Sequence, residues 1–274
     1  MTSPLRVGVI GLGPLWRRHY RPALLRLGDR FEVAGVCDQV HDRAARAAKR
    51  LACVAAAGPT DLLERTDAEA LLLLDSQWYG LWAAELACRA GKPAFCCPPA
   101  WLSGEEAESL RRQAESGGAP LMWALPLRVL PAALRLRELL DAGLGPPRLA
   151  LASVGAADGA ADLSLLDLLQ WCAGLFGVEP LRAQRVAAGG LSCVLLDYGD
   201  GRAAQLTFHS SPGRPPPARL DVVAEHGRAT LRLPDLLSWV DARGRHAHRP
   251  APSGPVAAAL LEEFHQALAA VDRQ

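Results

Sequence analysis

The chain has 274 residues, of which 50% are hydrophobic, and its formal net charge at pH 7 is +1. This length and hydrophobic content predict one large or two modest domains with a sizeable core. A net charge near zero creates no field that would attract nucleic acid or an anionic membrane. We therefore expect a small-molecule substrate or ligand as the partner, with no nucleic acid and no membrane.

The seven cysteines match no zinc-ligand spacing, and their number is odd. Most lie in apolar runs, where cysteine acts as a small hydrophobe, so we expect no metal site and a reduced, cytoplasmic protein. The N-terminal apolar run is short and broken by glycine, unlike a signal peptide. The apolar stretches at residues 70–74 and 163–175 are too short or too interrupted to span a bilayer.

The first expected element is an apolar strand at residues 5–10, followed by a glycine pair and a helix at residues 14–27. This order is typical of a dinucleotide-binding βαβ unit, in which bare N–H groups at the helix N-terminus receive a pyrophosphate. The pattern is incomplete because Trp16 occupies the third glycine place. Alternatively, the glycines only allow the tight turn of the fold. The candidate cofactor-binding residues here are Gly11, Leu12, Gly13, Pro14 and Leu15.

The second expected strand, at residues 31–37, ends at Asp38, and a helix at residues 42–51 follows. At this place a carboxylate typically binds the adenosine ribose 2′-OH and favours NAD over NADP. Asp38 as a solvated loop acid is the alternative, and the nearby Arg43 keeps NADP open. We therefore expect NAD or NADP, with NAD slightly favoured, or no cofactor at all.

Strands and helices continue to alternate up to residue 124, which predicts a parallel, doubly wound sheet. Thr60 is the expected N-cap of one helix, and Ser103 with Glu106 forms an expected capping box on another. The further expected strands lie at residues 68–74, 93–97 and 120–124. The further expected helices lie at residues 60–65, 82–90 and 103–116.

Two segments follow strands at the sheet edge where ligands bind in such folds. Residues 75–79 follow the central strand, and Tyr79 is a candidate proton donor or a buried loop aromatic. Cys97, in the vicinal pair Cys96-Cys97, is a candidate for redox or nucleophilic chemistry, or a cysteine packed near the cleft. The diproline Pro98-Pro99 is a candidate for a cis bond.

Beyond residue 125 the pattern predicts an α+β domain with a mainly antiparallel sheet. Proline-rich loops are expected at residues 211–217 and 250–254, and a basic turn at residues 243–249. The expected helices lie at residues 131–142, 161–176 and 255–271. The expected strands lie at residues 148–154, 181–187, 191–198, 203–209, 219–224, 229–233 and 237–241. The predicted α/β fold is thus an N-terminal Rossmann domain at residues 1–124 and a substrate and oligomerisation domain at residues 125–274.

This order of elements resembles the Gfo/Idh/MocA family of NAD(P)-dependent oxidoreductases over nearly the whole chain. The resemblance implies hydride transfer to or from a small hydroxyl, carbonyl or imine substrate. It also implies a homo-oligomer formed through the open face of the second sheet. The segments that carry the resemblance are Gly11–Gly13 with Arg17–His19, Phe31–Asp38, Ala90–Cys96, Arg135–Gly145 and Leu165–Trp171.

The family signature Glu-Lys-Pro is replaced in this chain by Cys97-Pro98-Pro99. Pro98 has no ionisable side chain and no N–H, so it can neither transfer a proton nor donate a hydrogen bond. In the family's Asp-x-Gly-x-His-x-x-Asp helix start, only the last acid, Asp167, is present. Ser164 occupies the histidine place, and Asp162 occupies the glycine place.

The usual proton partners of the family are therefore missing from this chain. If it is active, we expect Asp167, Tyr79 or Cys97 to supply the proton relay. Asp167 on its apolar helix could instead pair with an arginine at an interface. A different class of function is the alternative: a non-catalytic family member that senses a ligand or scaffolds a partner.

Overall fold

The structure, a computed structural model, describes residues 3–100, 102–157, 160–161, 163–210, 217–249 and 255–271. It divides into two compact units: Met1–Ala124 with Gly254–Gln274, and Leu125–Ser253. The sequence-based division placed the last helix with the second domain, whereas the structure groups it with the first unit. Asp162, residues 211–216 and residues 250–254 lie outside the described residues.

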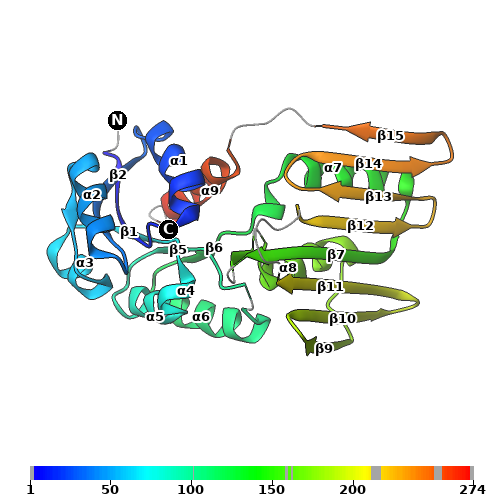
Figure 1. The fold of residues 1–274 in the computed structure, drawn as a ribbon, viewed down its shortest axis with the longest axis horizontal. Helices are drawn as coiled ribbons and strands as arrows, with labels where there is room; N and C mark the ends of the chain where they lie inside the picture. The colour runs from blue at the N-terminus through cyan, green and yellow to red at the C-terminus, as the bar shows by residue number, and fades with distance from the viewer. Residues whose placement is uncertain are drawn as a thin grey trace. The chain divides into compact units, whose positions relative to one another are not determined.

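The first unit is built on a six-stranded sheet with the order β3-β2-β1-β4-β5-β6, in which every neighbouring pair is parallel. This confirms the predicted Rossmann fold, and the helices of this unit flank its sheet (Figure 1). The strands are β1 Leu5–Ile10, β2 Phe31–Cys37, β3 Val54–Ala55, β4 Ala70–Leu73, β5 Ala94–Cys96 and β6 Leu121–Trp123.

The first unit differs from prediction at several points. Residues 16–20 form one π-helical turn, η1, where Trp16 stands in place of the third glycine and is buried. The helix after β3 begins at Pro59 with Gly58 as its cap, so the assignment of Thr60 was wrong. The Pro98 and Pro99 peptide bonds are not cis. The helices are η1 Trp16–Tyr20, α1 Arg21–Arg26, α2 His41–Leu51, α3 Pro59–Arg65, α4 Ser76–Tyr79, α5 Trp82–Arg89, α6 Gly104–Ser116 and α9 Val256–Val271.

The C-terminal helix α9 joins the first unit because its apolar face completes that unit's core. Leu260, Leu261 and Phe264 are fully buried, and the Phe264 ring lies 5.7 Å from the Phe95 ring of β5. Strands β1 and β4 are buried over most of their length, as expected of central parallel strands covered on both faces. The predicted capping box of α6 is confirmed, with Ser103 and Glu106 bonding reciprocally.

The second unit contains a nine-stranded sheet with the order β15-β14-β13-β12-β7-β11-β10-β9, and β8 pairs with β7. All its pairs are antiparallel except β7 with β11, which confirms the mainly antiparallel prediction. The strands are β7 Pro147–Ala157, β8 Ala160–Ala161, β9 Arg182–Ala188, β10 Leu191–Gly199, β11 Arg202–Ser210, β12 Arg219–Ala224, β13 Gly227–Arg232, β14 Leu236–Asp241 and β15 Gly244–His248. Strand β15 corrects the expected basic turn, because its backbone pairs with β14.

Helices α7 and α8 lie behind this sheet and leave its other face open (Figure 1). The strand residues alternate accordingly: Val194, Leu196 and Leu206 are buried, whereas Leu195 is exposed. Helix α8 begins at Leu165, later than the predicted residue 161. No helix among the described residues is long and apolar enough to cross a membrane. The helical elements of this unit are η2 Pro126–Arg128, α7 Pro131–Leu139, η3 Leu140–Leu144 and α8 Leu165–Phe176.

Candidate functional site

The loop between β1 and η1 needs both of its glycines. Gly11 has φ of +91°, and a Cβ at this position would lie 2.4 Å from the Asp75 Cβ. A Cβ on Gly13 would lie 2.9 Å from the Asp75 Oδ2. Of the other expected loop residues, Leu12 is buried, whereas Pro14 and Leu15 are exposed at the entry to the helix. The loop therefore approaches the end of β4 more closely than any side chain would permit.

The carboxylate of Asp38, at the end of β2, holds this loop in place. Its Oδ2 accepts a hydrogen bond of 2.7 Å from the Leu12 N–H, and its Oδ1 accepts one of 2.8 Å from the Val40 N–H. Arg43 Nη1 donates to the same two oxygens at 3.0 and 3.2 Å. The Asp38 side chain is only 2% exposed. A carboxylate has about four acceptor sites, so these contacts leave Asp38 little capacity for a ribose hydroxyl.

Five arginines from η1, α1 and α2 line a cavity of about 210 Å³ beside this loop. Arg43, Arg46 and Arg50 are spaced i, i+3, i+7 on α2, which places them on one helix face. Arg17 and Arg21 are spaced i, i+4 on η1 and α1. Among the described residues, only Arg43 of the five has a carboxylate partner, Asp38. The cavity is therefore strongly cationic and suited to a phosphate group.

Among these arginines, sequence reasoning connected only Arg43 with cofactor binding, and it named Arg17 only as part of the family resemblance. The helical spacing on α2 was a readable signal for Arg46 and Arg50, but it did not reveal that a second helix faces them. The sequence also did not single out Asp75 as a neighbour of the glycine loop. That contact depends on how β4 aligns beside β1, which places Leu73 opposite Ile10.

Asp75 and Tyr79 belong to the short helix α4, at the carboxyl end of β4. Asp75 is the N-cap, and its Oδ1 accepts from the Gln77 N–H at 3.3 Å. The Tyr79 hydroxyl donates to the Ile10 carbonyl oxygen at 3.0 Å. Burial raises the pKa of Tyr79 well above its ordinary value. Its phenol is thus committed to the end of β1 and is a weak acid there.

Cys97 follows β5 and is buried. Its Sγ lies 3.5 Å from the Tyr20 hydroxyl, and burial raises the pKa of the thiol to about 12. A thiol with this pKa is almost entirely protonated at neutral pH and is a poor nucleophile. All seven cysteines are free thiols. Among the described residues, no group of three or more His, Cys, Asp or Glu side chains could hold a metal ion.

Asp167 lies in the second unit, in the first turn of α8, and is 1% exposed. Its Oδ1 accepts from the Leu127 N–H at 3.3 Å, whereas its buried Oδ2 has no hydrogen-bond partner. Burial raises the pKa of Asp167 to about 7. Ser164 is the N-cap of the same helix, and its Oγ accepts from the Asp167 N–H at 3.1 Å. Ser164 therefore has a local structural role where the family has a histidine.

Part of this chain matches a known protein family. The family described as "Oxidoreductase family, NAD-binding Rossmann fold" matches residues 5–125, which include the glycine loop and Asp38. A crystal structure of UDP-N-acetylglucosamine 3-dehydrogenase from Acidithiobacillus ferrooxidans is similar over 98% of this chain and 90% of that one, with 28% identity and a TM-score of 0.76. Residues 5–125 of the chain thus match the Gfo/Idh/MocA family model. This match supports the resemblance seen in the sequence.

The curated relatives match about half of this chain. The Acidithiobacillus dehydrogenase is 34% identical over 144 residues, which are 53% of this chain and 43% of the relative. Inositol 2-dehydrogenase 3 from Saccharopolyspora erythraea is 34% identical over 152 residues, 53% of this chain and 44% of the relative. These matches thus span less than half of each relative. Both relatives are named as dehydrogenases.

A 3-ketoreductase from Actinomadura kijaniata, solved in complex with NADP, has the same fold. It is similar over 98% of this chain and 90% of that one, with a TM-score of 0.81 and 24% identity. At this identity the likeness supports the fold only. The family model that matches residues 5–125 is described as NAD-binding.

Proposed function

We propose that this chain is an NADP-binding oxidoreductase-like protein of the Gfo/Idh/MocA family with a diverged proton relay. The preference for NADP rests on the hydrogen bonds of Asp38. Its carboxylate oxygens already accept hydrogen bonds from Leu12, Val40 and Arg43. A carboxylate selects NAD by bonding the ribose 2′-OH, and Asp38 is not available for that bond. We therefore propose NADP in place of the NAD that the sequence favoured.

The arginine-lined cavity supports the same choice. A phosphate monoester carries a charge of about −1.5 to −2 at pH 7. Arg17, Arg21, Arg46 and Arg50 have no carboxylate partner among the described residues, and they line the cavity together with Arg43. Arginine guanidinium groups bind phosphate oxygens in a bidentate manner. These residues thus fit the 2′-phosphate of NADP, while the glycine loop fits the pyrophosphate.

A bound nicotinamide would exchange a hydride with the substrate, so the chain must exchange a proton. Asp167 is the best of the three candidates because its pKa of about 7 permits proton transfer in either direction near neutral pH. The Tyr79 hydroxyl is bonded to a backbone carbonyl, and the Cys97 thiol is buried with a pKa of about 12. We propose a hydroxyl, carbonyl or imine of a small sugar-like molecule as the substrate class, since the curated relatives act on sugars and inositol.

Titration calorimetry with NADPH and NADH tests the proposal. We expect NADPH to bind at least tenfold more tightly than NADH. Arg46→Ala should weaken the binding of NADPH and leave that of NADH unchanged. Lys49→Ala is the matched control, since Lys49 is an exposed cation on the same helix that does not line the cavity. Equal affinity for both nucleotides, or binding of neither, would contradict the proposal.

A second candidate function is that of a non-catalytic ligand sensor or scaffold. The observation that favours it is the loss of both usual proton partners at Pro98 and Ser164, the second of which now caps α8. Turnover across a panel of sugars, polyols and imines separates the two readings. NADPH binding without turnover of any substrate would favour the sensor, and turnover that disappears in Asp167→Asn would favour the enzyme.

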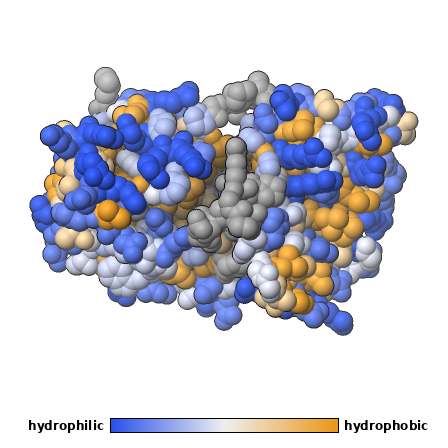
Figure 2. All heavy atoms as spheres, in the orientation of Figure 1, coloured by the Kyte–Doolittle hydropathy of each residue, from blue (hydrophilic) through white to orange (hydrophobic). Residues whose placement is uncertain are grey.

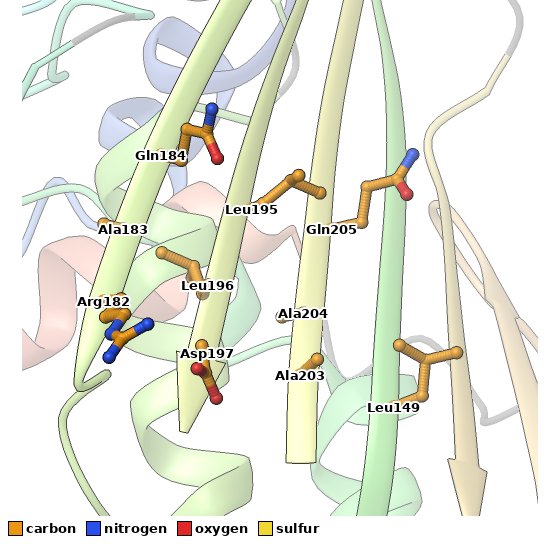
Figure 3. Close-up of a pocket in the computed structure, with 10 residues that line it drawn as sticks. All are labelled: Leu149, Arg182, Ala183, Gln184, Leu195, Leu196, Asp197, Ala203, Ala204 and Gln205. Carbon is orange, nitrogen blue, oxygen red and sulfur yellow. The ribbon is translucent and has the colours of Figure 1, made fainter. Parts of the chain in front are cut away.

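We also propose that the open face of the second unit's sheet forms a homo-oligomer interface. This face carries a shallow depression of about 750 Å³, with Leu149, Leu195 and Gln205 projecting from neighbouring strands (Figure 3). Val186, Leu191 and Val223 are also exposed large hydrophobic residues, and Figure 2 shows apolar patches among polar groups over this unit. Light scattering after size-exclusion chromatography tests this proposed interface. Leu195→Glu should convert an oligomer into a monomer. A native protein that is already monomeric would refute the proposal.

A further inference from the structure

Asp75 occupies the space that the second glycine of the loop opens. In dinucleotide-binding folds, this glycine lets the backbone approach the pyrophosphate, because no Cβ stands between them. In this chain the direction of a Gly13 Cβ leads to the Asp75 Oδ2, at 2.9 Å. A Cβ on Gly11 would lie 2.4 Å from the Asp75 Cβ and 2.8 Å from the Asp75 backbone nitrogen. An acidic side chain therefore lies where an anionic group would have to bind.

The groups that surround Asp75 come from several elements. Asp38, at the end of β2, destabilises a charge on Asp75, and Arg43 on α2 stabilises it. The hydroxyl of Tyr79 and the thiol of Cys97 also lie near enough to interact with the Asp75 charge. Burial is the largest influence and raises the pKa of Asp75, although the backbone N–H of residue 77 lowers it. Asp75 is thus a carboxyl group that takes up a proton more readily than an exposed one.

We propose that dinucleotide binding by this chain is coupled to protonation of Asp75. A carboxylate beside Gly13 repels a pyrophosphate on the loop, whereas a protonated carboxyl is neutral and can donate a hydrogen bond to a phosphate oxygen. One proton is taken up from solvent on binding, and no covalent bond changes. Asp75 is thereby a specificity-determining residue that this chain adds to its glycine loop. The inference rests on the proposed function, since it requires that NADP binds at this loop.

The coupling predicts how affinity changes with pH. Above the pKa of Asp75 in the free protein, each further pH unit should weaken NADP+ binding by up to tenfold, until the complex itself loses the proton. The 2′-phosphate titrates near pH 6, and its ionisation acts in the opposite direction. Comparison of the native protein with Asp75→Asn isolates the contribution of Asp75, because the phosphate is common to both.

Two probes distinguish failure of this inference from failure of the proposed function. NADP+ contains the pyrophosphate, whereas adenosine 2′-monophosphate contains only the group proposed for the arginine cavity. Both are titrated by calorimetry between pH 5.5 and about 8.5, in two buffers of different ionisation enthalpy, so that proton uptake is measured directly. Asp29→Asn is the control, because Asp29 is an acid of the same unit with a 76% exposed side chain.

We expect Asp75→Asn to bind NADP+ at least tenfold more tightly than the native protein at pH 8, with no proton uptake assignable to residue 75. Adenosine 2′-monophosphate should bind both proteins equally, and Asp29→Asn should behave as the native protein. Parallel pH profiles for the native protein and Asp75→Asn would overturn the inference. The inference would also be overturned if adenosine 2′-monophosphate binds while NADP+ binds neither the native protein nor Asp75→Asn. Failure of both probes with every variant would instead overturn the proposed function.

Discussion

Replacement of Asp38 by asparagine is the sharpest test of the structural reasoning about the glycine loop. The native carboxylate accepts from two backbone donors through different oxygens: the buried Leu12 N at 2.7 Å and the partly buried Val40 N at 2.8 Å. Asparagine has one acceptor oxygen, and its other terminal atom is a donor. One of the two N–H groups must therefore face another donor or lose its partner. The side chain keeps its size, so the effect is electrostatic and not a cavity.

The magnitude follows from these contacts. An unsatisfied buried donor costs about 1–3 kcal/mol. The lost ion pair with Arg43 adds at most about 1 kcal/mol, because the Arg43 side chain is 39% exposed and solvent screens the pair. We therefore expect Asp38→Asn to lower the free energy of unfolding of the first unit by roughly 1–4 kcal/mol.

Urea denaturation followed by circular dichroism and tryptophan fluorescence measures this loss. The two units can unfold separately, so the transitions are fitted as two steps where they do not coincide. Asp29→Asn, at an exposed acid of the same unit, is the control and should change stability by less than about 0.5 kcal/mol. A loss for Asp38→Asn as small as that of the control would refute the reasoning. It would mean that the carboxylate does not hold the loop and is free to bind a ribose.

Three further outcomes are expected. The buried Asp167 has a pKa of about 7 in the folded protein against 3.8 as its ordinary value, so its stabilising effect is present below pH 3.8 and is lost as pH rises through about 7. This difference corresponds to roughly 4 kcal/mol, and Asp167→Asn should flatten that part of the profile of unfolding free energy against pH. Gly11→Ala should prevent stable folding or destabilise the first unit by more than about 3 kcal/mol, because its Cβ would meet Asp75; a thermal midpoint unchanged in calorimetry would contradict this. Ser103→Ala should remove the capping box of α6 and cost about 1 kcal/mol in urea denaturation, with no loss expected at the exposed Ser116 as control.

Much of the fold could be read from local patterns. The apolar run at β4 and the Ser103–Glu106 capping box are local signals, and both predicted features are present. The prediction of secondary structure failed where the residue types fit both a turn and a strand. The segment at residues 243–249 reads as a polar turn, but it forms β15 because an edge strand can be exposed and polar when its partner β14 supplies the hydrogen bonds.

The assignment of the last helix shows a different kind of limit. The amphipathic pattern of α9 predicts a helix with one buried face, but it does not identify the surface that covers this face. That surface is in the first unit, where the Phe264 ring packs against the Phe95 ring. These two residues are far apart in the sequence. No local signal encodes a contact between residues so far apart in sequence.

The glycine loop contains both kinds of information. The sequence by itself determined that a strand, two glycines and a helix come first, and that Asp38 ends the next strand. Only the tertiary structure decided that the Asp38 carboxylate accepts hydrogen bonds from Leu12, Val40 and Arg43. The same is true of the position of Asp75 beside Gly13. The physical reason is that hydrogen-bond capacity and charge depend on distances across the sheet edge. Those distances are set by strand register and packing, which no local pattern records.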